Sequence, residues 1–470
     1  MKNSSVEPKG DKNFSRRELL VGASAGVAAS VAGSALPAWS QSSDAASKSA
    51  PAGKAAQNAT VSSLPKAWSS EEFRRRWQLV RQRMKDSHLD CLIVPQHIAQ
   101  AMIRDRQDGD ADVQYLVGIP AGWAVFPLEG KITAISSRIA PLLAQKKPIP
   151  GVVMTTLFAE SAPDIEARFT DEEGLWSPTI IDTLREKKME KARIGVGSLA
   201  DIFRNTEGCV TYTTFDRIQK AFPQAHFESA ADLLWRVKLV HSSEEITALE
   251  RATEVSEVGL KTMMDTARPG SVHRDVWLNM YRAMVQASGE RPWRLSISAG
   301  SEGNGSFGFP LEDVFHGGQI LSQECSGSVL GYGSQVNHSV LLGGPAPADW
   351  ASAGQACLDL FHALVDRIGP GKSIKEFCDF YGEQLKARGA RPGGVLLHSS
   401  GLADLPRSGP GRSEGGDDLL FQTGMVFDVK PAVPVKQTTT SAQFGDSLVV
   451  TDKGARRLGK RKMELITIGA

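Results

Sequence analysis

The sequence predicts an α/β (α+β) protein built from two domains. Its 470 residues exceed the size of one ordinary domain, and 41% of them are hydrophobic, which suffices for large cores. In the first half, short apolar runs that suit strands alternate with helical patterns. In the second half, a capped helix pattern precedes two strand patterns that flank a turn at Gly331-Tyr332. Helices and strands are therefore expected in both domains.

The N-terminal domain is expected to cover residues 68–234. It opens near Glu71 with a helix whose apolar residues recur at helical spacing: Phe73, Trp77, Val80 and Met84. The apolar run at 89–95 predicts a buried strand. Three further strands are expected at 123–127, 132–135 and 192–196, the first two joined by a turn at Glu129-Gly130.

The second domain is expected to cover residues 235–470. Ser242 is a suitable helix N-cap, and Glu245 stands at the capping-box position three residues later. Apolar residues from Ile246 to Val255 share one face of the helix that follows, and Arg268-Pro269-Gly270 closes the segment. In the later strand pair, alternation places Ser322, Glu324 and Ser326 on one face.

The N-terminus reads as a targeting segment. Paired arginines, Arg16 and Arg17, stand directly before an uncharged run of Ala, Gly, Ser and Val that extends from Leu19 to Ser43. We expect a twin-arginine signal peptide over residues 1–40, recognised by the twin-arginine export machinery, and a flexible linker over residues 41–67. The mature protein is then periplasmic. The apolar run is too weak for a membrane span, so no membrane anchor is expected in the mature protein.

Charge and cysteine content exclude several classes of function. Removing residues 1–40 takes five basic and three acidic groups from totals of 54 and 53, which leaves 49 against 50. The chain has no excess of basic residues, so its charge gives no indication of a nucleic-acid partner. The five cysteines are odd in number and widely spaced, so they predict neither a disulfide framework nor a zinc site.

Three stretches near the C-terminus form a recognisable series. They are 323–335 (QECSGSVLGYGSQ), 397–402 (LHSSGL) and 424–431 (GMVFDVKP), the last followed by 444–447 (FGDS). Their order resembles the pita-bread family of methionine aminopeptidase, prolidase, aminopeptidase P and creatinase. The resemblance covers roughly residues 68–470. It implies a creatinase-like N-terminal domain, a C-terminal pita-bread domain and a homodimer in which each N-terminal domain lies near its partner's site.

The resemblance also identifies five positions that hold two metal ions in the metal-dependent members. There the family has Asp, Asp, His, Glu and Glu; this chain has Glu324, Gln335, His398, Lys430 and Gly445. A two-metal site needs several carboxylates, and the ammonium group of a lysine repels cations. We therefore expect no metal and no other cofactor. A single metal stays conceivable if Asp404 or Asp428 replaced a lost ligand.

Among these relatives, creatinase has the local sequence most similar to the residues before Gly331. Creatinase is a C–N hydrolase that works without metal. In an ungapped alignment, the catalytic base of creatinase corresponds to Phe307 of this chain. In an alignment with a gap, it corresponds to His316 instead. Two glutamates that hold the guanidinium substrate of creatinase correspond to Asn337 and Lys430. A lysine in that place argues for a carboxylate-bearing or oxygen-rich substrate.

Eight residues are the candidate site. The expected catalytic residues are His398, Lys430 and Glu324, and the expected substrate-binding residues are Gln335, Asn337, Asp404, Arg407 and Asp428. His398 is either a proton shuttle or a former ligand now bonded within the core. Lys430 and Glu324 form either a catalytic pair or a structural ion pair. His338 is expected to lie in the wall of the pocket or in the core.

These residues favour a metal-independent hydrolase or lyase acting on a small polar molecule, with a C–N bond preferred. Two alternatives stay open. One is a non-catalytic protein that binds a small molecule. The other is a metallo-aminopeptidase or C–S lyase with replacement ligands.

Overall fold

The computed structural model describes residues 61–95, 111–118, 122–136, 164–171, 173–200, 207–300, 312–402, 405–438 and 440–469, and the backbone of two short strands, β2 (Ala99–Gln100) and β3 (Gln107–Asp108). The described residues belong to one compact unit, Ala56–Ala470. The expected signal peptide lies outside them. Within them, no helix combines the length and the apolar character that a membrane span requires.

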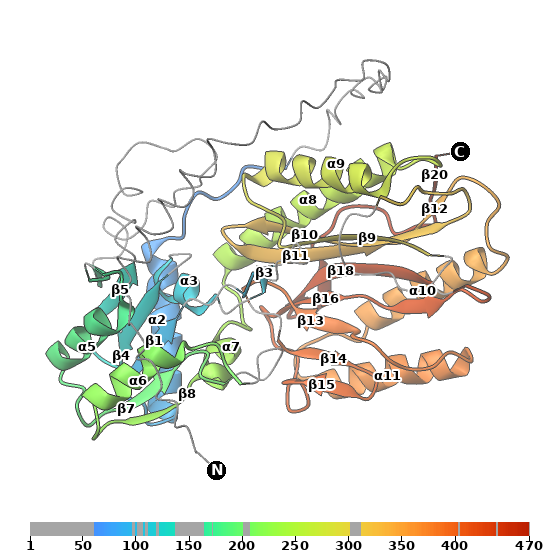
Figure 1. The fold of residues 1–470 in the computed structure, drawn as a ribbon. Coiled ribbons are helices and arrows are strands. Elements are labelled where there is room, and N and C mark those ends of the chain that lie inside the picture. The colour runs from blue at the N-terminus through green and yellow to red at the C-terminus, as the bar shows by residue number, and fades with distance from the viewer. Residues whose placement is uncertain are drawn as a thin grey trace, which may run out of the picture. The chain divides into compact units, whose positions relative to one another are not determined.

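The N-terminal domain contains a six-stranded sheet in the order β6-β5-β4-β1-β7-β8 (Figure 1). β1 pairs antiparallel with β4 and parallel with β7. Its elements are α2 (Ser70–Asp86), β1 (Cys91–Pro95), α3 (Asp112–Val117), β4 (Trp123–Pro127), β5 (Ile132–Ser136), β6 (Ile165–Phe169), α5 (Trp176–Glu186), β7 (Arg193–Val196), α6 (Tyr212–Ala221), β8 (His226–Ser229) and α7 (Ala231–Val237).

The predicted first helix is confirmed as α2. Ser69 caps it, since its hydroxyl accepts a hydrogen bond from the backbone N–H of Glu72. The helix buries the apolar stripe seen in the sequence, from Phe73 to Met84. The strands predicted at 89–95, 123–127, 132–135 and 192–196 are also present, as β1, β4, β5 and β7.

The C-terminal domain is built on a twelve-stranded sheet. Its main path is β15-β14-β13-β16-β18-β11-β10-β12-β20, with β17 and β19 paired to β18 and β9 paired to β10. The strands are β9 (Arg294–Gly300), β10 (Ile320–Val329), β11 (Tyr332–His338), β12 (Val340–Leu342), β13 (Leu397–Ser399), β14 (Arg407–Gly409), β15 (Arg412–Glu414), β16 (Val426–Val429), β17 (Ala432–Pro434), β18 (Ser441–Thr451), β19 (Gly454–Arg457) and β20 (Thr467–Ile468).

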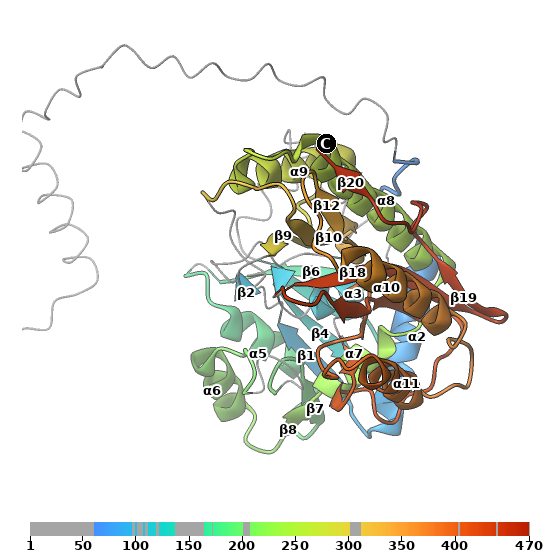
Figure 2. The same cartoon turned by 90° about the vertical axis from the view of Figure 1, so that its right-hand side faces the viewer.

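Helices cover one face of this sheet, which leaves the other face for polar side chains. They are α8 (Ser243–Thr266), α9 (His273–Ser288), α10 (Trp350–Val365) and α11 (Ile374–Ala387). The first two pack on β9, β10 and β11, and α10 packs on β18 (Figures 1 and 2). The predicted capping box of α8 is confirmed, since Ser242 and Glu245 bond reciprocally.

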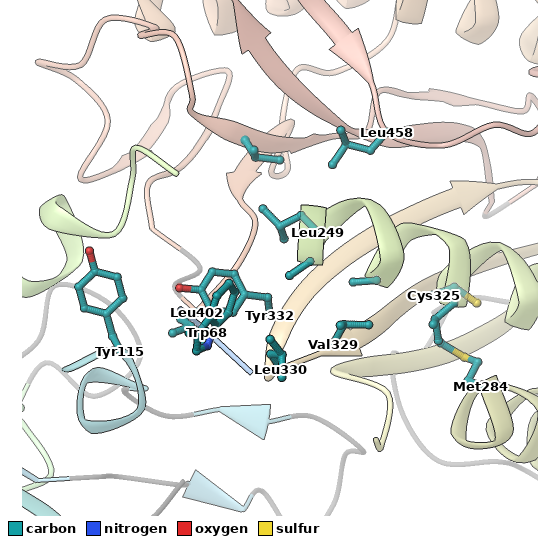
Figure 3. Close-up of a cluster of buried hydrophobic side chains, with 14 of the residues drawn as sticks. Trp68, Tyr115, Leu249, Met284, Cys325, Val329, Leu330, Tyr332, Leu402 and Leu458 are labelled. Atoms are coloured by element: carbon teal, nitrogen blue, oxygen red, sulfur yellow. The ribbon is translucent and has the colours of Figure 1, made fainter. Parts of the chain in front are cut away.

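The two domains share a buried junction (Figure 3). The ring of Trp68 lies 4.9 Å from that of Tyr332, and the guanidinium of Arg76 stacks 4.4 Å above Trp68. The Tyr332 hydroxyl donates to Glu245 Oε1 at 2.5 Å, and Arg76 Nη2 lies 3.2 Å from the same oxygen as an ion pair. Residues 61–67, the end of the expected linker, also contact α8, since the backbone N–H of Ser62 donates to Glu254 at 2.9 Å.

Candidate functional site

Strand register places four of the polar residues in one row. Arg407 on β14 pairs with His398 on β13, His398 pairs with Asp428 on β16, and Asp428 pairs with Ser447 on β18. Directly paired residues point to the same face of a sheet. Three residues predicted from separate motifs are therefore neighbours.

A second polar row lies across β9, β10 and β11. Ser326 pairs with Gln335 on one side and with Arg294 on the other. Residues two positions along these strands share the face, which adds Glu324 and Asn337. All five side chains come from strands that α8 and α9 cover on the opposite face.

The two rows meet where β11 and β18 part. These strands pair at Asn337–Gly445 and His338–Phe444. At Gln335 the backbone N–H instead donates to the Ser447 hydroxyl, at 3.1 Å, and to Asp428 Oδ1, at 3.2 Å. The gap in the ladder brings the Asp428 carboxyl group to the middle of the polar face.

Glu324 lies between two cations. Lys430 Nζ donates to Glu324 Oε1 at 2.7 Å, which confirms the predicted contact, and Arg294 Nε lies 2.6 Å from Glu324 Oε2. The Lys430 and Glu324 side chains are only 5% and 4% exposed. Burial favours a raised pKa for Glu324, but Lys430 and Arg294 outweigh it and lower that pKa to about 2. Burial likewise lowers the pKa of Lys430, against the opposing effect of Glu324.

Arg294 is a site residue that the sequence did not reveal. It belongs to no motif and lies 30 positions before Glu324 in the chain. Only the register of β9 against β10, with Arg294 opposite Ser326, brings the two together.

Asp428 and His398 form a buried pair. His398 Nδ1 lies 3.5 Å from Asp428 Oδ2 and 3.0 Å from the carbonyl oxygen of Ser399. Asp428 Oδ1 accepts hydrogen bonds from the hydroxyls of Ser400, at 2.9 Å, and Ser447. Burial raises the pKa of Asp428 to about 7, although these donors and Lys430 oppose the change. A carboxyl group that titrates near neutrality next to an imidazole is typical of proton-transfer sites.

The amide groups of the site bond to each other and to neighbouring protein groups. Gln335 Nε2 donates to Asn337 Oδ1 at 2.9 Å, and Gln335 Oε1 accepts from Ser326 at 3.3 Å. Asn337 Nδ2 donates to the carbonyl oxygen of Gln323 at 2.8 Å. Arg407 is buried, with its Nε 3.6 Å from Glu414 Oε2. Asp404 lies outside the described residues.

Gly445, which the resemblance assigns to the fifth ligand position, has no space for a side chain. A Cβ atom added to Gly445 would lie 2.7 Å from Lys430 Cβ and 2.8 Å from the carbonyl oxygen of Val429. Both distances are shorter than real contacts allow. A carboxylate at this position therefore requires movement of the neighbouring backbone.

Two domain families match this architecture. Residues 76–240 match the Creatinase/Prolidase N-terminal domain, and residues 247–452 match Metallopeptidase family M24. The chain belongs to the creatinase/prolidase family with the pita-bread fold. The family consists of peptidase-like hydrolases that act on C–N bonds.

Relatives of this creatinase/prolidase family protein are distant. A Xaa-Pro dipeptidase of Pyrococcus furiosus is 20% identical over 65% of this chain and 85% of its own length. An uncharacterised hydrolase/peptidase of Sinorhizobium fredii is 22% identical over 85% and 98%. The structure of a Xaa-Pro dipeptidase from Bacillus anthracis has a TM-score of 0.66, is 16% identical and covers 84% of this chain and 100% of that one.

The residues of this family member do not fit the two metal ions that a metallopeptidase holds. Both Glu324 oxygens face cations, and one of these cations is the ammonium of Lys430, at a position that the resemblance assigns to a ligand. Gln335 is neutral, and Gly445 has no side chain. Among the described residues, no three His, Cys, Asp or Glu groups converge as metal ligands.

The structure also locates the other histidines that the sequence singled out. His316 is exposed in the turn before β10, so it does not join the buried group. Phe307 lies outside the described residues. His338, expected to be wall or core, is buried, and its ring packs edge-on against Phe444 at 5.0 Å.

Proposed function

We propose that the protein is an exported hydrolase that cleaves a C–N bond of a small carboxylate-bearing molecule without a metal ion. The observation that carries this proposal is the buried His398–Asp428 pair beside the Lys430–Glu324–Arg294 cluster, in place of the family's metal ligands. Membership of a family of C–N hydrolases supports the reaction class.

His398 is the proposed proton carrier. The Ser399 carbonyl oxygen holds its ring at Nδ1, and Asp428 lies beside it. Water adds to the carbon of the scissile bond, and its proton passes to the imidazole. The C–N bond then breaks, and the imidazole returns that proton to the leaving nitrogen. Lys430 is placed to stabilise negative charge that develops on oxygen.

The charges of the polar face favour an anionic substrate. Lys430, Arg294 and Arg407 supply three positive charges, against Glu324, Asp428 and Glu414. A proton on Asp428, whose pKa is about 7, leaves one positive charge in excess. A substrate carboxylate complements that charge, and a guanidinium group does not.

The test is turnover after metal removal. We expect the purified mature chain to contain far less than one divalent metal ion per molecule by elemental analysis. Treatment with a chelator should change neither its melting temperature nor its hydrolysis of a panel of N-acyl, N-carbamoyl and amidino carboxylic acids. His398→Gln should abolish hydrolysis, while Glu250→Gln, at an exposed pair with Arg456, should not. Two tightly bound metal ions per chain, or activity that chelation removes, would refute the proposal.

One observation favours a second function, that of a binding protein without turnover. The carboxylate of Glu324 and the amides of Gln335 and Asn337 already bond to protein groups, so the site is internally satisfied. In that case a carboxylate from the panel raises the melting temperature, but no product forms. The metallo-aminopeptidase and C–S lyase alternatives both need replacement metal ligands. The relatives' names favour the first of them, and among the described residues no three ligand groups converge.

We also infer export by the twin-arginine route, on the basis of Arg16 and Arg17 before the uncharged run, and assembly as a homodimer, as the family resemblance implies. Arg16→Lys/Arg17→Lys should leave the chain in the cytoplasm with its first 40 residues uncleaved. Cell fractionation and immunoblotting measure this. Unchanged periplasmic delivery of the double variant would show that another route operates.

A further inference from the structure

A groove lies away from the polar face, between α8 and the segment 460–466. Its volume is about 490 Å³, within the range of small-molecule sites. Four apolar side chains, from both sides, lie among the charged ones that line it: Val258, Leu260, Met264 and Ile466. The proposed function uses none of these residues.

His338 lines this groove and is only 1% exposed. Its Nε2 lies 2.9 Å from the carbonyl oxygen of Glu464. A carbonyl only accepts hydrogen bonds, so Nε2 carries the ring proton. Burial, with the nearby charge of Arg461, lowers the pKa of His338 to about 3, so the ring is neutral and Nδ1 is an acceptor.

That acceptor is not satisfied within the protein. No donor from the described residues bonds to His338 Nδ1. A buried polar atom without a partner is costly, and native structures rarely keep one unless water or a ligand completes it. A donor from outside the chain is therefore expected at this atom.

Five of the seven charged side chains that line the groove form ion pairs within the protein. Lys460 Nζ lies 2.5 Å from Glu254, and Arg461 lies 3.5 Å from Glu257. The Lys261 ammonium lies 2.5 Å from Asp265. A strongly charged ligand would have to compete with these pairs, whereas a neutral one would not.

We propose that this groove is a second binding site, for a neutral and mainly apolar molecule that donates one hydrogen bond to His338 Nδ1. The apolar lining recognises the body of the ligand. The histidine selects an N–H or O–H group over an ether, a tertiary amine or a hydrocarbon.

Indole and 1-methylindole test this proposal, because they have similar apolar bodies and only indole donates a hydrogen bond. Titration of the mature chain, followed by ligand-observed NMR, should show that indole binds at least about tenfold more tightly, since 1-methylindole leaves the acceptor unmet. In His338→Gln, the glutamine Nε2 can keep the bond to Glu464, and its carbonyl oxygen does not occupy the position of Nδ1. The preference for indole should then disappear.

His273→Gln is the matched control. His273 is also buried and bonds through Nε2 to a carbonyl oxygen, that of Ile297 at 3.0 Å, but it does not line the groove. It should leave the preference intact, whereas Val258→Trp, which fills the groove, should abolish binding of both probes. Equal affinities for the two probes in the unmodified chain, unchanged binding in Val258→Trp, or no binding of indole up to its solubility limit would each overturn the proposal. The last result would indicate that only water meets the histidine.

Discussion

Replacing Glu324 with glutamine should be the most destabilising single change on the polar face. The variant leaves Lys430 and Arg294 buried together without the carboxylate that both contact, at 2.7 and 2.6 Å. Removal of one member of a buried ion pair typically costs about 3–5 kcal/mol, because the remaining charge is uncompensated. The free energy of unfolding, measured by urea denaturation, should fall by an amount of this order.

Arg294 changes the expected order of the variants. From the sequence, Lys430→Met would be expected to be more harmful than Lys430→Met combined with Glu324→Gln. The contact of Arg294 with Glu324 predicts the reverse order, because Lys430→Met leaves Glu324 paired with Arg294. We now expect Lys430→Met to be the mildest variant, the double variant intermediate and Glu324→Gln the least stable. Additive effects of the two single changes would show that the pair is not coupled.

The Glu324 carboxylate should also make the free energy of unfolding depend on pH in the acid range. The pKa of Glu324 is about 2 in the folded protein, against an ordinary value of 4.5. The contribution of Glu324 to the free energy of unfolding is therefore fully present above pH 4.5. It is lost as the pH falls toward 2, a change of about 3 kcal/mol. Glu324→Gln should lack this part of the acid dependence, and Glu250→Gln should retain it.

The second large effect is the pH dependence that Asp428 gives to the free energy of unfolding. Its direction is opposite to that of Glu324. The pKa of Asp428 is about 7 in the folded protein and 3.8 ordinarily, so between these values the folded state holds a proton that the unfolded chain has released. The free energy of unfolding should therefore fall as the pH rises from 4 through 7, by about 4 kcal/mol from this group. Asp428→Asn can keep an acceptor for Ser400 and Ser447 and should remove that decline.

Urea unfolding at intervals from pH 4 to 8 measures this effect. The control is Asp182→Asn, an exposed carboxylate on α5, which should reproduce the pH dependence of the unmodified chain. Equal slopes for the unmodified chain and Asp428→Asn would show that the Asp428 proton does not contribute.

Local sequence signals predicted the elements well. The stripe from Phe73 to Met84 and the pair Ser242 and Glu245 act within one or two helical turns, so their consequences can be read from neighbouring residues. The Lys430–Glu324 contact was predicted because both residues stand at positions whose spatial relation the family resemblance supplies.

Features that depend on register could not be predicted in this way. Arg294 reaches Glu324 because β9 pairs with β10 in one alignment and not in another, and no local pattern specifies that alignment. The parting of β11 from β18 at Gln335 likewise depends on Ser447 and Asp428, which lie more than 90 positions away in the chain.

The close approach of the backbone at Gly445 restricts which side chains residue 445 can carry. Lys430 Cα lies 2.9 Å from the added Cβ, and Val429 contributes its carbonyl oxygen, so the obstruction persists whatever side chain residue 430 carries. An acidic side chain introduced at residue 445 alone would meet main-chain atoms before its carboxylate could bind anything. A dinuclear metal centre on this face would therefore require a change in the spacing of two strands, which no single substitution at residue 445 supplies.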